Sequence, residues 1–148
     1  MIPAIVLLAA FAVLRLVGLA GVAELDNWNA PLRLALGAMF LFTASAHWGR
    51  GRPDLVRMVP PAFPAPGMIV SITGVLEILG AAGLLISSTA HAAAICLAVL
   101  LAAMFPANVR AARERLTILG RPAPSLALRT TLQVLFIGTL LAVAVHPR

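Results

Sequence analysis

A single acidic residue, Glu77, stands in the stretch GVLEILGAAGLL (residues 74–85), whose other residues are Gly, Ala, Val, Leu and Ile. A carboxylate at this place needs a partner, because an isolated charge in an apolar environment is costly. On a helix the face around Glu77 carries mostly small residues, and the opposite face carries bulky aliphatic ones. Small residues let a neighbouring helix come close. We therefore expect Glu77 to point into a helical bundle, beside Gly74, Gly80 and Ala81.

Two arginines in apolar stretches, Arg15 and Arg33, are candidate partners for Glu77. We expect Glu77 to form a buried charge cluster with Arg33, or with both arginines. Such a cluster has two interpretations, which the sequence leaves open. It is either an ion pair that fixes helix register, or a site that binds a ligand or handles protons. A carboxylate between two guanidinium groups stays ionised, which argues against a proton relay.

Three uncharged polar residues complete the candidate site. His47 precedes Trp48 at the end of an apolar stretch, and is either an interfacial anchor or a hydrogen-bonding group for a ligand head group. Pro106 should kink or end its helix, so Asn108 either satisfies the freed carbonyl groups or faces the site. Gln133 should face the bundle, whereas snorkelling to the interface explains the nearby Arg129 without any function.

The sequence lacks the residues that several kinds of chemistry require. One cysteine, Cys96, excludes an internal disulfide and intrinsic dithiol exchange, and we expect it to be a buried packing residue. The three histidines lack the spacing of metal ligands, so we assign no metal site. Because there is also no nucleophile–base pair and no phosphate-binding loop, we assign no catalytic residue. Enzymatic activity stays an open question, and the chain is at most part of an oxidoreductase complex.

The elements that position these residues are predicted to be transmembrane helices. The 148 residues are 61% hydrophobic and only 11% charged, against roughly 25% charged residues in a soluble domain. Long apolar runs predict an all-α integral membrane bundle, formed by residues 1–148 as one domain. The five predicted spans cover residues 3–22, 30–48, 67–87, 90–108 and 127–146. Trp28 and Trp48 bracket the second span, as interfacial indoles do.

The arginine distribution predicts the orientation of the chain. The loop after the second span and the loop after the fourth span are rich in arginine, and five spans place both loops on one side. The positive-inside rule then puts the N-terminus in the cytoplasm and the C-terminus outside, in a multi-pass protein of the cell membrane. A four-span chain with a cleaved first segment keeps both loops cytoplasmic too, so charge does not decide whether the first span is retained. The net charge of +6 is explained by these loops, and nothing indicates nucleic-acid binding.

The first of these loops, RGRPDLVRMVPPAFPAP (residues 50–66), is more than a tether. Residues 54–59 can form one or two helical turns, with Leu55, Met58 and Val59 facing the membrane and Arg57 facing water. The prolines that follow forbid helix. The segment is either a stiff connector or a lid over a binding site.

Three stretches together resemble the DoxX-like family of small helical membrane proteins: LRLALGAMFLFTASAHW (residues 32–48), GVLEILGAAGLL (residues 74–85) and MFPANV (residues 104–109). The resemblance implies a four-helix DoxX-like core, to which the first span is an N-terminal transmembrane addition. It also implies Arg33, His47, Glu77 and Asn108 as functional positions. Family members are linked to membrane redox systems, including quinone-using oxidoreductases, and distant relatives assist the assembly of other membrane proteins.

The leading hypothesis is an accessory or small subunit of a membrane redox system. It has no intrinsic cofactor and binds a quinone or another lipophile, with His47 and Asn108 near the inner interface. The alternative is a non-catalytic assembly or scaffolding protein, in which the buried charges are structural. A small-solute transporter ranks third, since no internal repeat or broken helix pair is present. The expected partners are the lipid bilayer and other membrane subunits.

Overall fold

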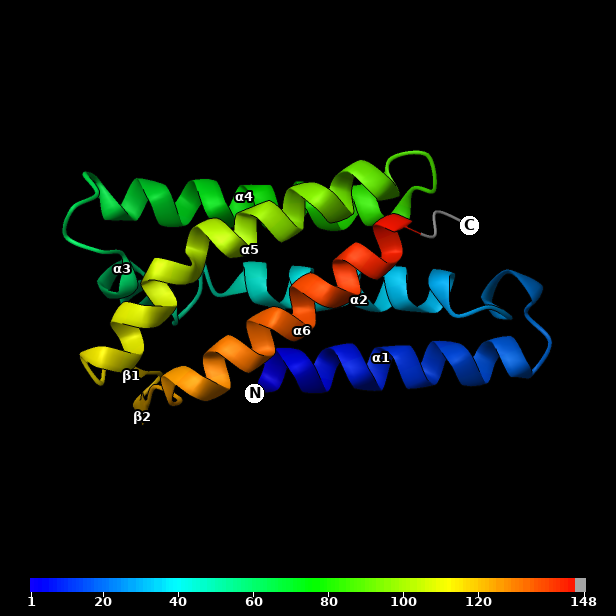
Figure 1. Cartoon of the computed structure of the whole chain (residues 1–148), viewed down its shortest axis with the longest axis horizontal. Coiled ribbons are helices and arrows are strands. Elements are labelled where there is room, and N and C mark those ends of the chain that lie inside the picture. Colours follow the sequence, from blue (N-terminus) through cyan, green and yellow to red (C-terminus); the bar gives the residue numbers. More distant parts are fainter. Residues whose placement is uncertain (146–148) are drawn as a thin grey trace.

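The computed structural model describes residues 1–145, and that part of the chain is all-α with six α-helices (Figure 1). The elements are α1 (Ile2–Leu19), the 3-10 turn η1 (Ala23–Leu25), α2 (Asn29–Ser45), α3 (Arg52–Met58), α4 (Pro66–Leu85), α5 (Ala90–Arg113), the short hairpin β1 (Thr117–Ile118) and β2 (Arg121–Pro122), and α6 (Leu126–Val145). The last residue of the predicted fifth span, His146, lies outside the described residues.

Four helices, α1, α4, α5 and α6, are long and apolar enough to cross a membrane. This confirms four of the predicted spans and indicates a multi-pass membrane protein in contact with lipid. The second predicted span corresponds to α2, which has 17 residues and is at the short end of what a bilayer core requires. Trp28 and Trp48 lie partly exposed just beyond its two ends.

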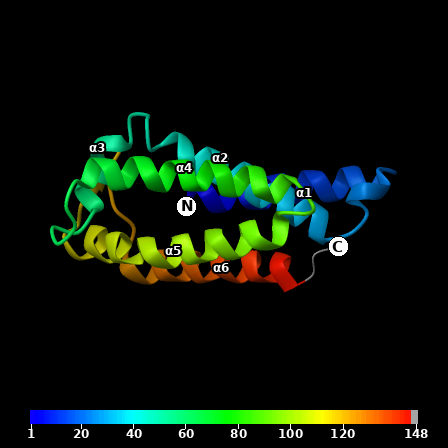
Figure 2. The ribbon, with the colours of Figure 1, turned by 90° about the horizontal axis from the view of Figure 1, so that it is seen from above.

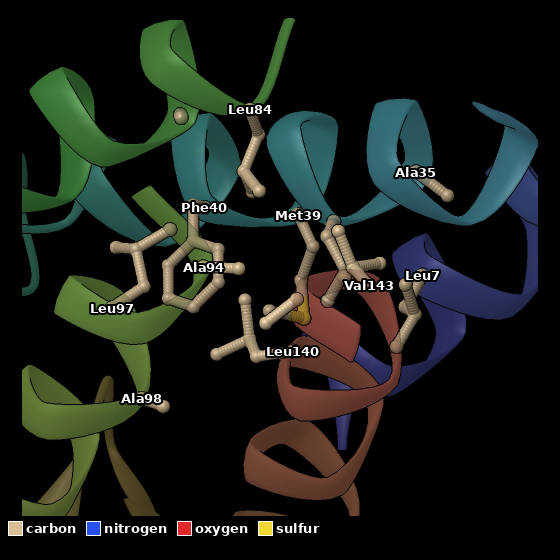
Figure 3. Close-up of a cluster of buried hydrophobic side chains, with 13 residues drawn as sticks. Leu7, Ala35, Met39, Phe40, Leu84, Ala94, Leu97, Ala98, Leu140 and Val143 are labelled. Atoms are coloured by element: carbon tan, nitrogen blue, oxygen red, sulfur yellow. The ribbon is translucent and has the colours of Figure 1, made fainter. Parts of the chain in front are cut away.

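The helices form two layers that share one apolar core. Figure 2 shows α2 and α4 in one layer and α5 and α6 in the other, and α1 packs along α2. Large buried side chains from several helices meet between the layers (Figure 3): Met39, Phe40, Leu84, Leu97, Leu140 and Val143. On the outer faces Leu79, Val99 and Val134 are more than 60% exposed, as expected for side chains that face lipid.

Small residues on α4 allow neighbouring elements to come close, as the sequence predicts. A Cβ atom added at Gly80 would lie 2.5 Å from the Leu97 side chain of α5, and one added at Gly74 would lie 2.7 Å from His47. Ala81 is fully buried. The small face of α4 therefore contacts two partners, α5 and the end of α2.

Helix α5 continues through Pro106 to Arg113, so the expectation that this proline could end the helix is wrong. Proline removes one backbone donor and usually bends a helix, and Figure 1 shows that the ribbon of α5 changes direction along its length. The Leu101 carbonyl, in the turn before Pro106, accepts a hydrogen bond from Gln133 Nε2 at 2.8 Å. This side chain supports the backbone where the proline weakens it.

The two arginine-rich loops lie together at one end of the molecule. Asp54 on α3 accepts a hydrogen bond from the Leu119 N–H at 2.7 Å, and Arg57 donates to the Thr117 carbonyl at 3.1 Å. The Leu119 N–H and the Arg57 guanidinium together hold the pKa of Asp54 below its usual range. These contacts confirm that both loops share a side; which side faces the cytoplasm stays a prediction.

The loop between α2 and α4 forms the predicted short helix, α3. Met58 and Val59 are buried, Leu55 is half-buried and Arg57 is exposed, which confirms the division into an apolar and a polar face. The apolar face packs against α4 and α5, so its predicted contact with the membrane is not seen. The proline-rich segment that follows α3 therefore lies beside α4 and α5, where Pro60 and Phe63 line a cavity.

Candidate functional site

Glu77 lies at the seam between α2 and α4 and is 3% exposed. This confirms that it points into the bundle. Its carboxylate oxygen Oε2 accepts a hydrogen bond from Thr43 Oγ1 at 2.8 Å. Within residues 1–145 no cation forms an ion pair with Glu77, so the predicted charge cluster is wrong.

The two arginines lie elsewhere, and the reason is helix register. Arg15 donates to the carbonyl groups of Leu25 and Asn27 at 3.0 and 2.8 Å, and its guanidinium lies 3.8 Å from Asp26. It therefore fixes the turn after α1. Because Thr43 is the residue of α2 that meets Glu77, Arg33, ten residues earlier, lies about 15 Å away along the same helix. Hydropathy indicates depth in a span but not which turns of two helices meet.

His47 is buried, with 3% of its surface exposed, and its Nδ1 has no hydrogen-bond partner. Gly74 leaves the room for it, since any Cβ there would lie 2.7 Å from the imidazole Cγ. The Trp48 ring lies beside it, with ring centroids 6.0 Å apart. The structure thus buries His47 inside the bundle, unlike an interfacial anchor with a wet polar tip.

Arg52 holds the backbone of His47 in place. From the sequence alone, Arg52 is only one of the charged residues of its loop. Its guanidinium donates to the His47 carbonyl at 2.7 Å, to the Gly67 carbonyl at 3.0 Å and to Ser71 Oγ at 3.0 Å. One side chain therefore joins the end of α2 to the start of α4. The only signal in the sequence is an arginine beside glycine and proline, which does not identify its acceptors.

A cavity of about 210 Å³ adjoins His47, and we call it the head-group cavity. Its wall comes from α3 and the proline-rich segment, from α4 and from α5. Its polar lining residues are His47, Thr73 and Asn108, and its apolar ones include Met58, Val59, Phe63, Val70, Leu100 and Met104. The proline-rich segment therefore forms one wall of a site, as the lid interpretation requires.

Asn108 belongs to a hydrogen-bonded network between α5 and α6. Its Nδ2 donates to Gln133 Oε1 at 2.9 Å, and its Oδ1 accepts from Arg129 Nη1 at 2.7 Å. Gln133 is buried, which confirms that it faces the bundle. Pro106 removes the helical donor for the Ala102 carbonyl, four residues earlier, and Gln133 donates to the adjacent Leu101 carbonyl. The bonds of Asn108 go instead to side chains of α6.

A second cavity, of about 770 Å³, lies on the other side of Asn108. We call it the cationic cavity because Arg121 and Arg129 line it, together with Gln133 and Asn108. Apolar residues line the rest: Ile2, Leu101, Leu119, Leu132 and Phe136 among them. The sequence does not indicate Arg121 as a site residue, since no pattern in it predicts that the hairpin shares a cavity with α6.

The structure thus joins some of the candidate residues and separates others. His47 and Asn108 line one cavity, and Asn108 and Gln133 line the other. Glu77 lies one helical turn beyond Thr73 and, like Arg15 and Arg33, lines neither cavity. Cys96 is exposed on α5, so the expectation that it is a buried packing residue is wrong.

Comparison with known proteins gives one match. A family model described as Domain of unknown function (DUF8561) matches residues 36–145, and the chain belongs to this family. The matched region contains His47, Glu77, Asn108 and Gln133 but neither Arg15 nor Arg33. No curated protein and no solved structure matches the chain.

Proposed function

Since the chain belongs to a family whose function is unknown, we propose from its cavities that it binds the head group of a lipophilic molecule such as a quinone. On this proposal the head-group cavity is the binding site, and the protein is an accessory subunit of a membrane redox system. One observation carries the proposal: a buried imidazole with an unpartnered Nδ1 lies beside a cavity that is otherwise mostly apolar.

The size and lining of the cavity suit a ring better than a whole lipid. Its 210 Å³ is below the roughly 300–1,000 Å³ of pockets for drug-sized ligands. An isoprenoid tail would therefore lie outside it, among the exposed apolar faces of the helices. A quinone would supply two-electron redox chemistry, which the side chains of this protein do not offer.

The polar groups at the cavity match the oxygen atoms of such a ring. An imidazole can donate or accept a hydrogen bond, and Asn108 Nδ2 has a second hydrogen besides the one that it gives to Gln133. A buried polar group without a partner costs roughly 1–3 kcal/mol. A ligand oxygen that bonds to Nδ1 of His47 after a rotation of the imidazole would recover this cost, which favours the bound state.

The proposal includes a finer membrane arrangement. We take α2 as a fifth span, so that five helices place the arginine-rich end in the cytoplasm with the N-terminus. The bundle of α2, α4, α5 and α6 would then be the DoxX-like four-helix core to which the sequence is similar, with α1 added before it. Glycosylation or thiol-labelling reporters placed in the turn between α4 and α5 would test this arrangement.

The direct test of the site is quantification of co-extracted lipophiles. The full chain is purified in mild detergent, and quinones are measured by mass spectrometry per mole of protein. We expect His47→Leu to lower the bound amount by about tenfold, the value of roughly 1.4 kcal/mol. His91→Gln is the control, because His91 lies at the other end of α5, and glutamine can keep the hydrogen bond of its ring to the Ala144 carbonyl. Equal occupancy in the two variants would contradict the proposal.

A scaffolding role is the second candidate, and the Glu77–Thr43 bond favours it, because a polar contact between two helices can serve packing alone. Two results together would favour scaffolding over ligand binding: the unchanged protein carries no lipophile, and His47→Leu co-purifies with the same membrane subunits as the unchanged protein does.

A further inference from the structure

The cationic cavity holds two guanidinium groups with no acidic partner. Within residues 1–145 the carboxylates near this end are engaged elsewhere: Asp54 bonds to Arg57, and Glu114 lies 3.0 Å from Arg110. Neither Arg121 nor Arg129 forms an ion pair in that part of the chain. Two positive charges therefore line one cavity without a counter-charge from residues 1–145.

Arg129 is the more constrained of the two. Its Nη1 donates to Asn108 Oδ1 at 2.7 Å, while its buried Nε has no hydrogen-bond partner. If Arg129 snorkelled, its guanidinium group would reach water, and its Nε would not be buried. Arg129 also lines the cavity, so the guanidinium N–H groups that Asn108 does not use are available to a ligand that enters there.

The apolar residues that line the cationic cavity indicate what kind of ligand it fits. Leu132 and Phe136 of α6 and Ile2 of α1 make part of the wall apolar. A ligand that matches both halves has an anionic group for the arginines and an apolar body for the helices. Arginine pairs with phosphate through two parallel hydrogen bonds, and the cavity lies at the arginine-rich end, where a helix meets the head groups of the bilayer.

We propose that the cationic cavity binds the phosphate group of an anionic phospholipid, with Arg129 and Arg121 as its ligands. This site is separate from the head-group cavity and does not rest on the function proposed above. The same residues could accept free phosphate, so the shared chemistry is a phosphate anion, and the two sources must be distinguished by experiment.

The test uses the full chain, delipidated in detergent, with three probes: phosphatidylglycerol, phosphatidylcholine and inorganic phosphate. Native mass spectrometry gives the affinity for each lipid, and thermal unfolding reports stabilisation by each probe. We expect phosphatidylglycerol to bind about tenfold or more tightly than phosphatidylcholine, and Arg129→Gln to abolish most of that preference. Inorganic phosphate alone should stabilise the protein little.

Two further variants separate binding from folding. Arg121→Gln leaves the Asn108 network intact, and should still weaken phosphatidylglycerol binding several-fold. Arg113→Gln is the control, because Arg113 is exposed in the last turn of α5 and lines neither cavity. The proposal is overturned if Arg113→Gln reduces binding as much as Arg121→Gln, if both lipids bind equally, or if inorganic phosphate binds as tightly as the lipid.

Discussion

The two cavities that meet at Asn108 differ in their charge. The head-group cavity is lined by no arginine and offers one imidazole in an apolar wall. The cationic cavity offers two guanidinium groups and two amides. Both adjoin the same bent helix, α5, so the difference comes from what packs on each side of it. The α4 side contributes small and apolar residues, and the α6 side contributes Gln133 and Arg129.

This contrast shows how one polar residue can serve two sites. The amide of Asn108 uses one hydrogen and its oxygen on the α6 side, and that leaves one hydrogen for the α4 side. The two sites should therefore be independent in the ligands that they prefer and linked through the position of this side chain.

The largest effect is expected from Asn108→Leu, which removes the shared residue at similar volume. Gln133 and Arg129 each lose a partner, at about 1–3 kcal/mol per buried group. We expect quinone and phosphatidylglycerol binding to fall together, by about tenfold each, whereas His47→Leu lowers only the first. Paired binding measurements check this. A loss confined to one ligand would show that the cavities do not share Asn108 functionally.

The next effect concerns the close packing that makes room for His47. Gly74→Ala places a methyl group 2.7 Å from the imidazole, which we expect to lower the free energy of unfolding by about 1–3 kcal/mol and to weaken quinone binding. Gly138→Ala is the matched control, since nothing lies within 4 Å of that position on α6, and it should be neutral or stabilising. Denaturation in detergent measures both, and similar losses would contradict the close approach.

Glu77→Gln tests the seam between α2 and α4 with a smaller expected change. The amide keeps an oxygen for the Thr43 hydroxyl and cannot ionise, and no cation within residues 1–145 pairs with Glu77. We expect unfolding free energy to stay the same or rise by about 1 kcal/mol, since an unpaired buried charge is costly. If an arginine did pair with Glu77, the same change would cost roughly 3–5 kcal/mol, and thermal unfolding distinguishes the two results.

The smallest effect is expected at the surface, where Asp54 joins α3 to the hairpin. The pKa of this carboxyl is lowered by the Leu119 N–H and by Arg57, so the contact stabilises the folded state fully above the unfolded pKa of about 3.9. That contribution is lost as pH falls through the lower folded pKa. Below about pH 4, the protection factor of the Leu119 N–H, which corrects for the pH dependence of intrinsic exchange, should therefore fall in the natural chain. In Asp54→Ala it should already be low at neutral pH; equal protection in both proteins at every pH would refute the link.

The sequence predicts much of the fold because hydropathy and small residues act locally. Apolar runs give the long helices, and the small face of α4 explains the burial of Glu77. The predicted pairing with Arg33 failed because register depends on which turns of two helices meet. The cavity near Arg121 could not be anticipated, since it depends on where the hairpin lies relative to α6.

Fluorescence of Trp48 tests the central claim most directly, because its ring lies 6.0 Å from that of His47. The chain has two tryptophans, so Trp28→Phe leaves Trp48 as the single reporter. Titration with a short-chain benzoquinone should quench it in a saturable way, and His47→Leu should remove the saturable part. Quenching that rises without saturation, and equally in both proteins, would show that the quinone only partitions into the detergent and that the cavity beside His47 does not bind it.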